Sequence, residues 1–258
     1  MRLLCFSRPM AVLLALMPAI AGAACIKNEP DWLWNYDGTL GGKYPVRMTL
    51  VFAGGDVTGM YFYASQLKDI PLRGRITNGT NLVLDELDGA GKVVARFEGN
   101  FLEQDPGGQF GDSKLECETI RGSWRKLDTN DALPVYLQMN NGTYGTLTNR
   151  YSVAGAEDDN LIHKNALRFW NAVKSGDKRT VASLVAYPIR AGVSGRKKRI
   201  KTPEEFIANY DGIFYPSYRE AVLRSLPRNM FVRDQGIMLG NGQVWFGPDG
   251  KVIALNNF

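Results

Sequence analysis

The chain has 258 residues, a formal net charge of +5, three cysteines and a single histidine. One histidine rules out an HExxH zinc site, and the sequence contains neither a GxSxG nucleophile elbow nor a Walker phosphate loop. The sequence therefore predicts no bound metal and no cofactor, and it lacks the motifs of α/β-hydrolases and of P-loop nucleotide-binding proteins.

Residues 1–24 have the organisation of a secretory signal peptide. Arg2 and Arg8 precede an apolar run over 10–20, and Ala21-Gly22-Ala23 supplies the small residues of a cleavage site. The apolar run is too short for a membrane span, which needs about 20 residues, and no later run is longer. We expect a periplasmic or secreted mature protein without a transmembrane segment, away from nucleic acid.

Cys5 leaves with the leader, so the mature chain keeps Cys25 and Cys117. In an oxidising compartment two cysteines most simply form one disulfide. Cys25 also lies close to the expected cut, where a lipoprotein carries its lipid anchor. Gly22 occupies a position at which lipoprotein signals usually have a large aliphatic residue, so the disulfide is the favoured reading of Cys25.

Hydrophobic residues recur with a period close to two through most of residues 25–140, which predicts an antiparallel β-barrel or sandwich. Turn-forming sequences separate the runs, among them Gly54-Gly55-Asp56 and Asn78-Gly79. About eight strands are expected, over residues 34–40, 46–52, 57–63, 70–76, 82–87, 93–101, 115–124 and 133–139. An up-and-down meander of this size can close into a barrel.

In strand order and strand length, this half loosely resembles the lipocalin and avidin-like up-and-down barrels. The resemblance implies an interior that is either filled by side chains or open to a small apolar ligand. Tyr61, Tyr63, Phe97, Phe101 and Trp124 are the aromatic residues that could line such a pocket. Bulky side chains normally fill small barrels, so we favour a closed core.

Residues 141–158 are rich in small polar and turn-forming residues and are expected to link two domains. The two halves also differ in charge. Residues 24–156 contain 13 basic and 16 acidic side chains, whereas residues 157–258 contain 16 basic and 10 acidic ones.

Residues 159–258 are expected to form an α+β domain. The pattern predicts a helix over 160–175 that Gly176 ends, and a second helix that Asp177 caps. A hairpin over 189–200 follows, with Gly192 and Gly195 at its turn, and Thr202-Pro203-Glu204-Glu205 begins a helix that extends to residue 213. Three strands are expected to complete the chain: one that runs from 230–233 into 236–239, one over 243–246 and one over 251–255.

Several motifs of this half resemble the NTF2-like superfamily of ketosteroid isomerases and polyketide cyclases, whose members form an α+β cone. The motifs are Phe169-Trp170 with Ser175-Gly176-Asp177, Tyr187-Pro188-Ile189, Glu205-Phe206, Tyr210-Asp211 and Gly242-Gln243-Val244-Trp245-Phe246. That superfamily includes enzymes and catalytically silent modules, so the fold alone implies no activity.

A pocket in such a cone would be lined by Tyr187, Tyr210, Trp245 and Trp170. Catalysis there would need a general base, for which Asp211 and His163 are candidates, and a donor such as Tyr210 or Tyr187. None of these residues matches the catalytic pattern of the isomerases position by position. Asp211 is more typical of a turn, and His163 of a non-catalytic helix residue.

The only run of like charge is formed by Arg196, Lys197, Lys198, Arg199 and Lys201. Such a cluster can attract phospholipid, lipopolysaccharide or an acidic protein. No aromatic residue is interleaved for stacking on bases, which argues against nucleic acid. A solvated hairpin is the simpler interpretation.

Together these features predict a periplasmic or secreted, non-enzymatic binding protein for a protein partner or a cell-envelope component, with inhibitor or immunity proteins as a special case. One alternative is a cofactor-free isomerase, cyclase or hydrolase that uses the C-terminal pocket. Another is a carrier of a small apolar ligand in the barrel.

Overall fold

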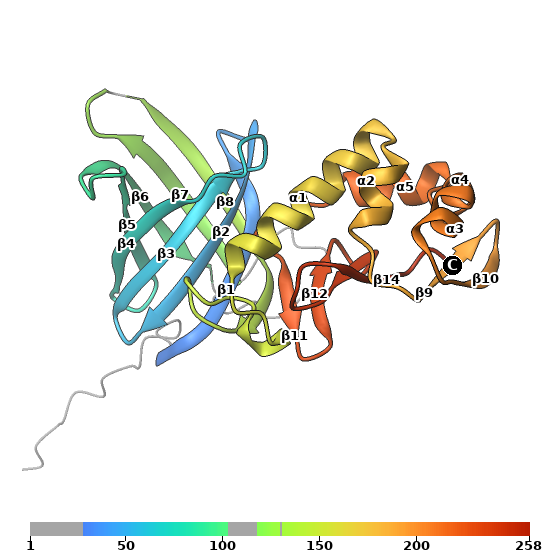
Figure 1. Cartoon of the computed structure of the whole chain (residues 1–258). Coiled ribbons are helices and arrows are strands. Elements are labelled where there is room, and N and C mark those ends of the chain that lie inside the picture. Colours follow the sequence, from blue (N-terminus) through green and yellow to red (C-terminus); the bar gives the residue numbers. More distant parts are fainter. Residues whose placement is uncertain (1–27, 103–117, 130) are drawn as a thin grey trace, which may run out of the picture.

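Figure 1 shows a computed structural model of the chain, which describes residues 28–102, 118–129 and 131–258. A β-barrel forms one end of the molecule and a mixed half of helices and short strands forms the other, with helix α1 (Asp159–Ser175) reaching from one to the other. The expected signal peptide, Cys25 and Cys117 lie outside the described residues.

The N-terminal half is a closed antiparallel barrel of eight strands, as its hydrophobic pattern predicts. Each strand pairs with the next along the chain, and the first pairs with the last. The strands are β1 (Asn28–Leu40), β2 (Tyr44–Ala53), β3 (Asp56–Tyr63), β4 (Ile70–Thr77), β5 (Asn81–Leu87), β6 (Val93–Phe101), β7 (Thr119–Lys126) and β8 (Ala132–Tyr144).

Three strand glycines allow neighbouring backbones to approach closely where the barrel curves. A Cβ atom on Gly38, Gly74 or Gly122 would lie 1.9, 1.8 or 2.1 Å from a carbonyl oxygen of the adjacent strand. Real Cβ atoms do not come so close, so only glycine fits at these positions.

Alternate residues along each strand point inward and fill the barrel with a hydrophobic cluster. It includes the aromatic side chains of Tyr36, Phe52, Tyr61, Phe97 and Phe101. A void of about 10 Å³ lies beside Leu82 and Leu84, which is barely the space of one water molecule. These side chains leave little room there for an apolar ligand.

The connector expected from residue 141 begins later in the structure. Residues 141–144 continue β8, because Asn141 pairs with Asn35 and Tyr144 with Trp32 of the long strand β1. A short 3-10 helix, Ser152–Ala154, then leads into α1. The turn-forming composition of Asn140-Asn141-Gly142 marks a register shift in the pairing rather than the end of the strand.

The C-terminal half contains α1, α2 (Lys178–Ser183), α3 (Pro203–Ala208), α4 (Tyr210–Ile213) and α5 (Pro216–Leu223). Strands β9 (Ile189–Val193) and β10 (Arg196–Ile200) form a hairpin. A four-stranded antiparallel meander completes it: β11 (Phe231–Arg233), β12 (Gly236–Leu239), β13 (Val244–Phe246) and β14 (Val252–Leu255). The first of the three strands expected here is therefore a hairpin, because the chain turns between Arg233 and Gly236 and β11 pairs with β12.

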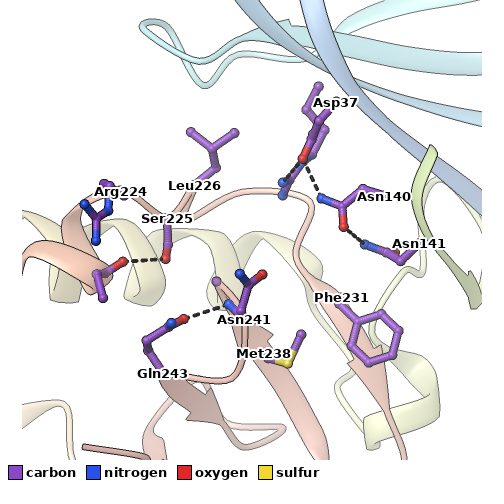
Figure 2. Close-up of a pocket in the computed structure, with 13 residues that line it drawn as sticks. Asp37, Asn140, Asn141, Arg224, Ser225, Leu226, Phe231, Met238, Asn241 and Gln243 are labelled. Atoms are coloured by element: carbon purple, nitrogen blue, oxygen red, sulfur yellow. Dashed lines mark hydrogen bonds and ion pairs between the residues drawn. The ribbon is translucent and has the colours of Figure 1, made fainter. Parts of the chain in front are cut away.

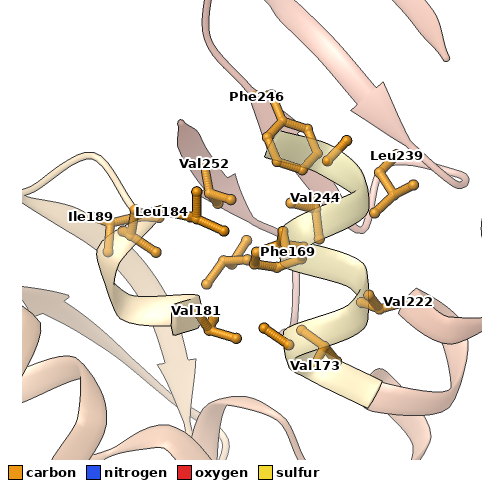
Figure 3. Close-up of a cluster of buried hydrophobic side chains, with 14 of the residues drawn as sticks. Phe169, Val173, Val181, Leu184, Ile189, Val222, Leu239, Val244, Phe246 and Val252 are labelled. Carbon is orange, nitrogen blue, oxygen red and sulfur yellow. The ribbon is translucent and has the colours of Figure 1, made fainter. Parts of the chain in front are cut away.

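This half has its own hydrophobic core, built around α1 (Figure 3). Phe169 projects from α1 and meets Phe246 of β13 edge-on, with 5.7 Å between ring centroids. Val173, Val181 and Val244 close around them. The core cluster does not include residues of the barrel core, so the chain has two separate hydrophobic centres.

Helix ends in this half follow the expected signals, with one difference. Asp177 caps α2 by accepting from the Thr180 amide, and Thr202 caps α3 by accepting from the Glu205 amide. The helix expected over 203–213 is interrupted at Asn209, whose side-chain amide donates to the Glu205 carbonyl at 2.7 Å. This local bond competes with helix continuation.

In the basic hairpin, the turn consists of Ser194 and Gly195, with φ values of +49° and +79°. Gly192, which was expected at the turn, lies inside β9 and pairs with Lys197. A two-residue turn with two positive φ angles matches the natural twist of a hairpin, which explains this register.

The C-terminal half covers part of the outer wall of the barrel. Leu33, Val51 and Phe62 alternate with inward-facing neighbours and so point outward, yet all three are buried. Their strands, β1 to β3, are adjacent in the barrel.

Within the described residues, no helix has the length and apolar character needed to cross a bilayer.

Candidate functional site: the interdomain cleft

A cleft of about 510 Å³ lies between the outer wall of the barrel and the C-terminal half (Figure 2). Its lining is mostly polar and comes from segments far apart in the sequence. The barrel contributes Asp37, Arg47, Asn140 and Asn141, and the other half contributes Ala221, Arg224, Ser225, Leu226, Phe231, Met238, Gly240, Asn241 and Gln243.

The barrel side of the cleft is a hydrogen-bonded row of charged and amide groups. Strand register places Arg47 opposite Asp37, and the guanidinium donates to both carboxylate oxygens at 2.6 and 2.8 Å. The Asn140 amide also donates to Asp37, and Asn141 accepts from buried Asn35 at 2.8 Å. These bonds hold the polar groups in fixed orientations.

The opposite side combines a polar turn with an apolar floor. The backbone amide of Asn241 donates to the side-chain Oε1 of Gln243 at 2.7 Å. The Tyr218 hydroxyl donates to the backbone carbonyl of Gln243 at 2.7 Å. Phe231 and Met238 lie opposite each other on paired strands and face the cleft from below (Figure 2). The cleft can therefore offer hydrogen bonds and a small hydrophobic contact to one ligand.

A buried arginine joins the two halves beside this cleft. Arg150 is 1% exposed, and its guanidinium donates to Oδ1 of Asn35 at 3.2 Å and to the Thr49 hydroxyl at 3.1 Å. Burial lowers its pKa below the ordinary value. The backbone amides of Arg150 and Tyr151 donate to the Asp159 carboxylate at the start of α1.

Three further bonds cross between the halves. Arg228 forms an ion pair with Asp69 of the barrel at 2.5 Å, and Asn229 donates to the same carboxylate at 3.0 Å. The Thr143 hydroxyl donates to the Val232 carbonyl at 2.8 Å. With Arg150, these contacts fix the walls of the cleft relative to each other.

His163 lies in this joint and not in a solvent-filled pocket. Its Nε2 accepts from the Asn229 backbone amide at 3.4 Å and lies 2.9 Å from the Tyr151 hydroxyl. That hydroxyl accepts from the Met230 amide at 3.0 Å and donates its own proton to Nε2. Burial, together with Arg228 and Arg150, lowers the pKa of His163 to about 3. The ring is neutral near pH 7, and its basic nitrogen is already engaged.

The other acid-base candidates lie apart from His163. Asp211 is in the first turn of α4, its side chain is 82% exposed, and it pairs with Lys178 at 2.7 Å. Tyr210 is buried and stacks on Phe214 with 4.8 Å between centroids, and burial raises its pKa to about 12. The structure thus does not bring Asp211 and His163 together.

Tyr187, Trp170 and Trp245, expected to line a C-terminal pocket, occupy separate places. The Tyr187 hydroxyl donates to the Ala182 carbonyl at 2.9 Å, and burial raises its pKa above the ordinary value. Trp170 lies under Lys174 of its own helix, and Trp245 is on β13 opposite Met238. Neither these three residues nor Tyr210 lines the cleft.

The run of positive charge over residues 196–201 is exposed along β10, as expected for a hairpin that faces solvent. Lys198 pairs with Glu205 at 3.2 Å, and the ammonium of Lys197 lies 4.4 Å from the ring centroid of Phe258. Arg196 and Arg199 are also exposed, and Lys201 follows the strand. This hairpin does not contribute to the cleft.

Sequence reasoning missed the cleft because its walls come from separate segments that only the docking of the halves brings together. The expected linker begins at Asn141, directly after Asn140, and Asn241 lies between two of the expected strands. A clustering of asparagine at both places was the available signal, but turns favour asparagine as well.

In comparisons with known proteins, no family model, no curated protein and no solved structure gives a significant match to this chain.

Proposed function

We propose that this protein is an exported, non-enzymatic binding protein, and that the interdomain cleft holds its ligand, a segment of a partner protein or a component of the cell envelope. The proposal depends on one observation, a cleft of about 510 Å³ whose polar side chains are already oriented by hydrogen bonds. Binding sites often occur between domains and have this size.

The lining indicates a ligand with many hydrogen-bonding groups and little net charge. Asp37 is neutralised by Arg47, and Arg224 pairs with Glu220 at 2.8 Å. The remaining polar groups include the amides of Asn140, Asn141 and Asn241, which both donate and accept. Peptide backbones and glycans present this combination of donors and acceptors.

We further propose that the C-terminal half has an NTF2-like fold whose interior has become a structural core. The order of two helices, a hairpin, further helices and a closing meander supports this idea. Phe169, Val181 and Phe246 fill the space between α1 and the meander. Ligand binding has then moved to the outside of this half, where it meets the barrel.

Site-specific photocrosslinking in the producing cells tests the cleft. A photoreactive amino acid at Asn241, which is exposed at the cleft, should form a discrete adduct with a peptide or an envelope glycan, identified by mass spectrometry. The matched control is Asn100, an exposed asparagine on β6, far round the barrel from β1. Identical adduct patterns at Asn241 and Asn100, or no adduct at Asn241, would contradict the proposal.

A blocking substitution gives an independent measure. Asn140→Trp places a large ring at the cleft and should weaken binding of the captured ligand at least about tenfold by calorimetry, while Asn100→Trp leaves it unchanged. Circular dichroism on both variants shows whether the fold is retained. Equal affinity of the Asn140→Trp variant and the unmodified protein would argue that the ligand binds elsewhere.

A further inference from the structure

At one end of the barrel, the carboxylate of Glu86 lies on the inward-facing side of its strand. Leu82 and Leu84 of β5 point into the barrel core, and the alternation of the strand places Glu86 on the same face. Glu86 is next to the last residue of β5, where the barrel opens at the loops after β1, β3, β5 and β7. It is partly exposed there.

The hydrogen bonds of this carboxylate come from neutral groups and go to a single oxygen. The Tyr61 hydroxyl donates to Oε2 at 2.7 Å, and the Trp124 indole donates to the same oxygen at 2.8 Å. Burial and the nearby Glu86 raise the pKa of Tyr61 well above its ordinary value, so this group remains a donor.

Among the described residues, no lysine, arginine or histidine forms an ion pair with Glu86. Two cationic side chains near this end have other partners. Lys126 pairs with Asp128 at 3.3 Å, and Lys43 lies over the Tyr44 ring at 5.3 Å. A carboxylate that lies among aromatic side chains, with one oxygen unbonded and no counter-charge, is suited to pair with a cationic ligand.

Aromatic rings surround the carboxylate. Tyr61 meets Tyr63 edge-on at 5.6 Å between centroids, and Tyr44 meets Tyr63 in the same way at 6.4 Å. Opposite Glu86 on β6 stands Ala95, which adds no charged or polar group beside the carboxylate. Tyr63 and Trp124 are partly exposed, so a ligand can reach their rings.

We infer that Tyr61, Tyr63, Glu86 and Trp124 form a binding site for an organic ammonium group, here called the mouth site. The ammonium would pair with the free oxygen of Glu86 and contact the partly exposed rings of Tyr63 and Trp124, while the buried Tyr61 holds the carboxylate in place. Aromatic rings attract cations through their quadrupole, most strongly when solvent is partly excluded. This inference does not depend on the cleft, because none of these residues lines it.

The test is a titration of the full mature chain with choline, tetramethylammonium and n-butylammonium. The uncharged control ligand is 3,3-dimethylbutan-1-ol, which has the shape of choline without its charge. Calorimetry measures the affinity, and the Trp124 indole N–H resonance, assigned with a Trp124→Phe variant, reports binding at the mouth site. At least one ammonium should bind with a shift of this resonance, while the alcohol binds at least about tenfold more weakly.

Glu86→Gln is the decisive variant, because the amide oxygen still accepts from Tyr61 and Trp124 while the charge is lost. It should weaken ammonium binding at least about tenfold. Tyr63→Leu should weaken it several-fold. The neighbouring Asp85→Asn, which removes the negative charge that pairs with Arg96 outside the mouth site, should have no effect. Thermal melts confirm that each variant is folded. No binding of any ammonium, equal binding of the alcohol, or full affinity in Glu86→Gln would each overturn the inference.

Discussion

Arg150 is the residue on which the contact between the two halves most depends. Its guanidinium is fully enclosed and bonded to Asn35 on β1 and Thr49 on β2, so its removal deletes two buried hydrogen bonds and leaves a cavity between the halves. We expect Arg150→Ala to lower the free energy of unfolding by about 3 kcal/mol in urea denaturation.

Arg75→Ala is the control for this prediction, because Arg75 is exposed on β4. It should change stability by less than about 0.5 kcal/mol. If the two substitutions have equal effects, the buried contacts of Arg150 contribute little to stability.

His163 should make the protein less stable as the pH is lowered, because it is buried as a neutral group. Histidine in an unfolded chain titrates near pH 6.5, whereas burial lowers the pKa of His163 to about 3 in the folded protein. The folded state therefore binds fewer protons between these values. The contribution of His163 is complete above about pH 6.5 and is lost as the pH falls toward 3.

Urea denaturation should show a loss of about 2 kcal/mol between pH 7 and pH 5 that is absent in His163→Gln. The comparison is direct because the chain has no other histidine. Parallel stability curves for the two proteins over this range would mean that the imidazole is not buried as a neutral group.

Among the elements, the barrel strands depend on glycine at their points of closest approach. In Gly74→Ala the new methyl group would meet the Val83 carbonyl oxygen at 1.8 Å, and the two strands would have to separate. We expect a loss of about 3 kcal/mol in chemical denaturation. The control is Gly89→Ala, in a turn with open space around it, which should have little effect. Similar losses in Gly74→Ala and Gly89→Ala would mean that the close approach at Gly74 is not the cause.

Sequence patterns predicted the barrel well because each strand has one face in the core and its period of two is plain. Alternation also identified Tyr61, Phe97 and Phe101 as interior residues. The interruption at Asn209 was not predictable from periodicity, since it results from one local hydrogen bond. Outward residues such as Phe62 gave no signal of their burial, because the covering half is distant in sequence.

The candidate sites show the same limit. His163 and Asp211 were singled out by residue type, and the structure separates them. The cleft and the mouth site depend on which strands become neighbours, as when Tyr61, Glu86 and Trp124 come together from β3, β5 and β7. Residue types alone do not specify such pairings.

At the scale of the whole molecule, the buried joint should make the two halves unfold together. Calorimetry of the intact mature chain should give one transition. Asp69→Ala removes the ion pair with Arg228 and the bond from Asn229, and should cost about 2 kcal/mol and split the transition in two.

Glu220→Ala removes the exposed pair with Arg224 and is the control for this experiment. It should preserve a single transition and cost less than about 0.5 kcal/mol. Two transitions in the unmodified protein would mean that the halves are energetically independent despite their contacts.

A barrel expressed without the C-terminal half would lose the cover over part of its outer wall. Leu33, Val51 and Phe62 would face water in a fragment that ends after β8, beside the strand pairs that carry them. Such a truncated protein would expose a hydrophobic patch and tend to self-associate. Gene fragments that separate the halves are therefore poor reagents, and during synthesis the outer wall of the barrel stays uncovered until the C-terminal half has emerged.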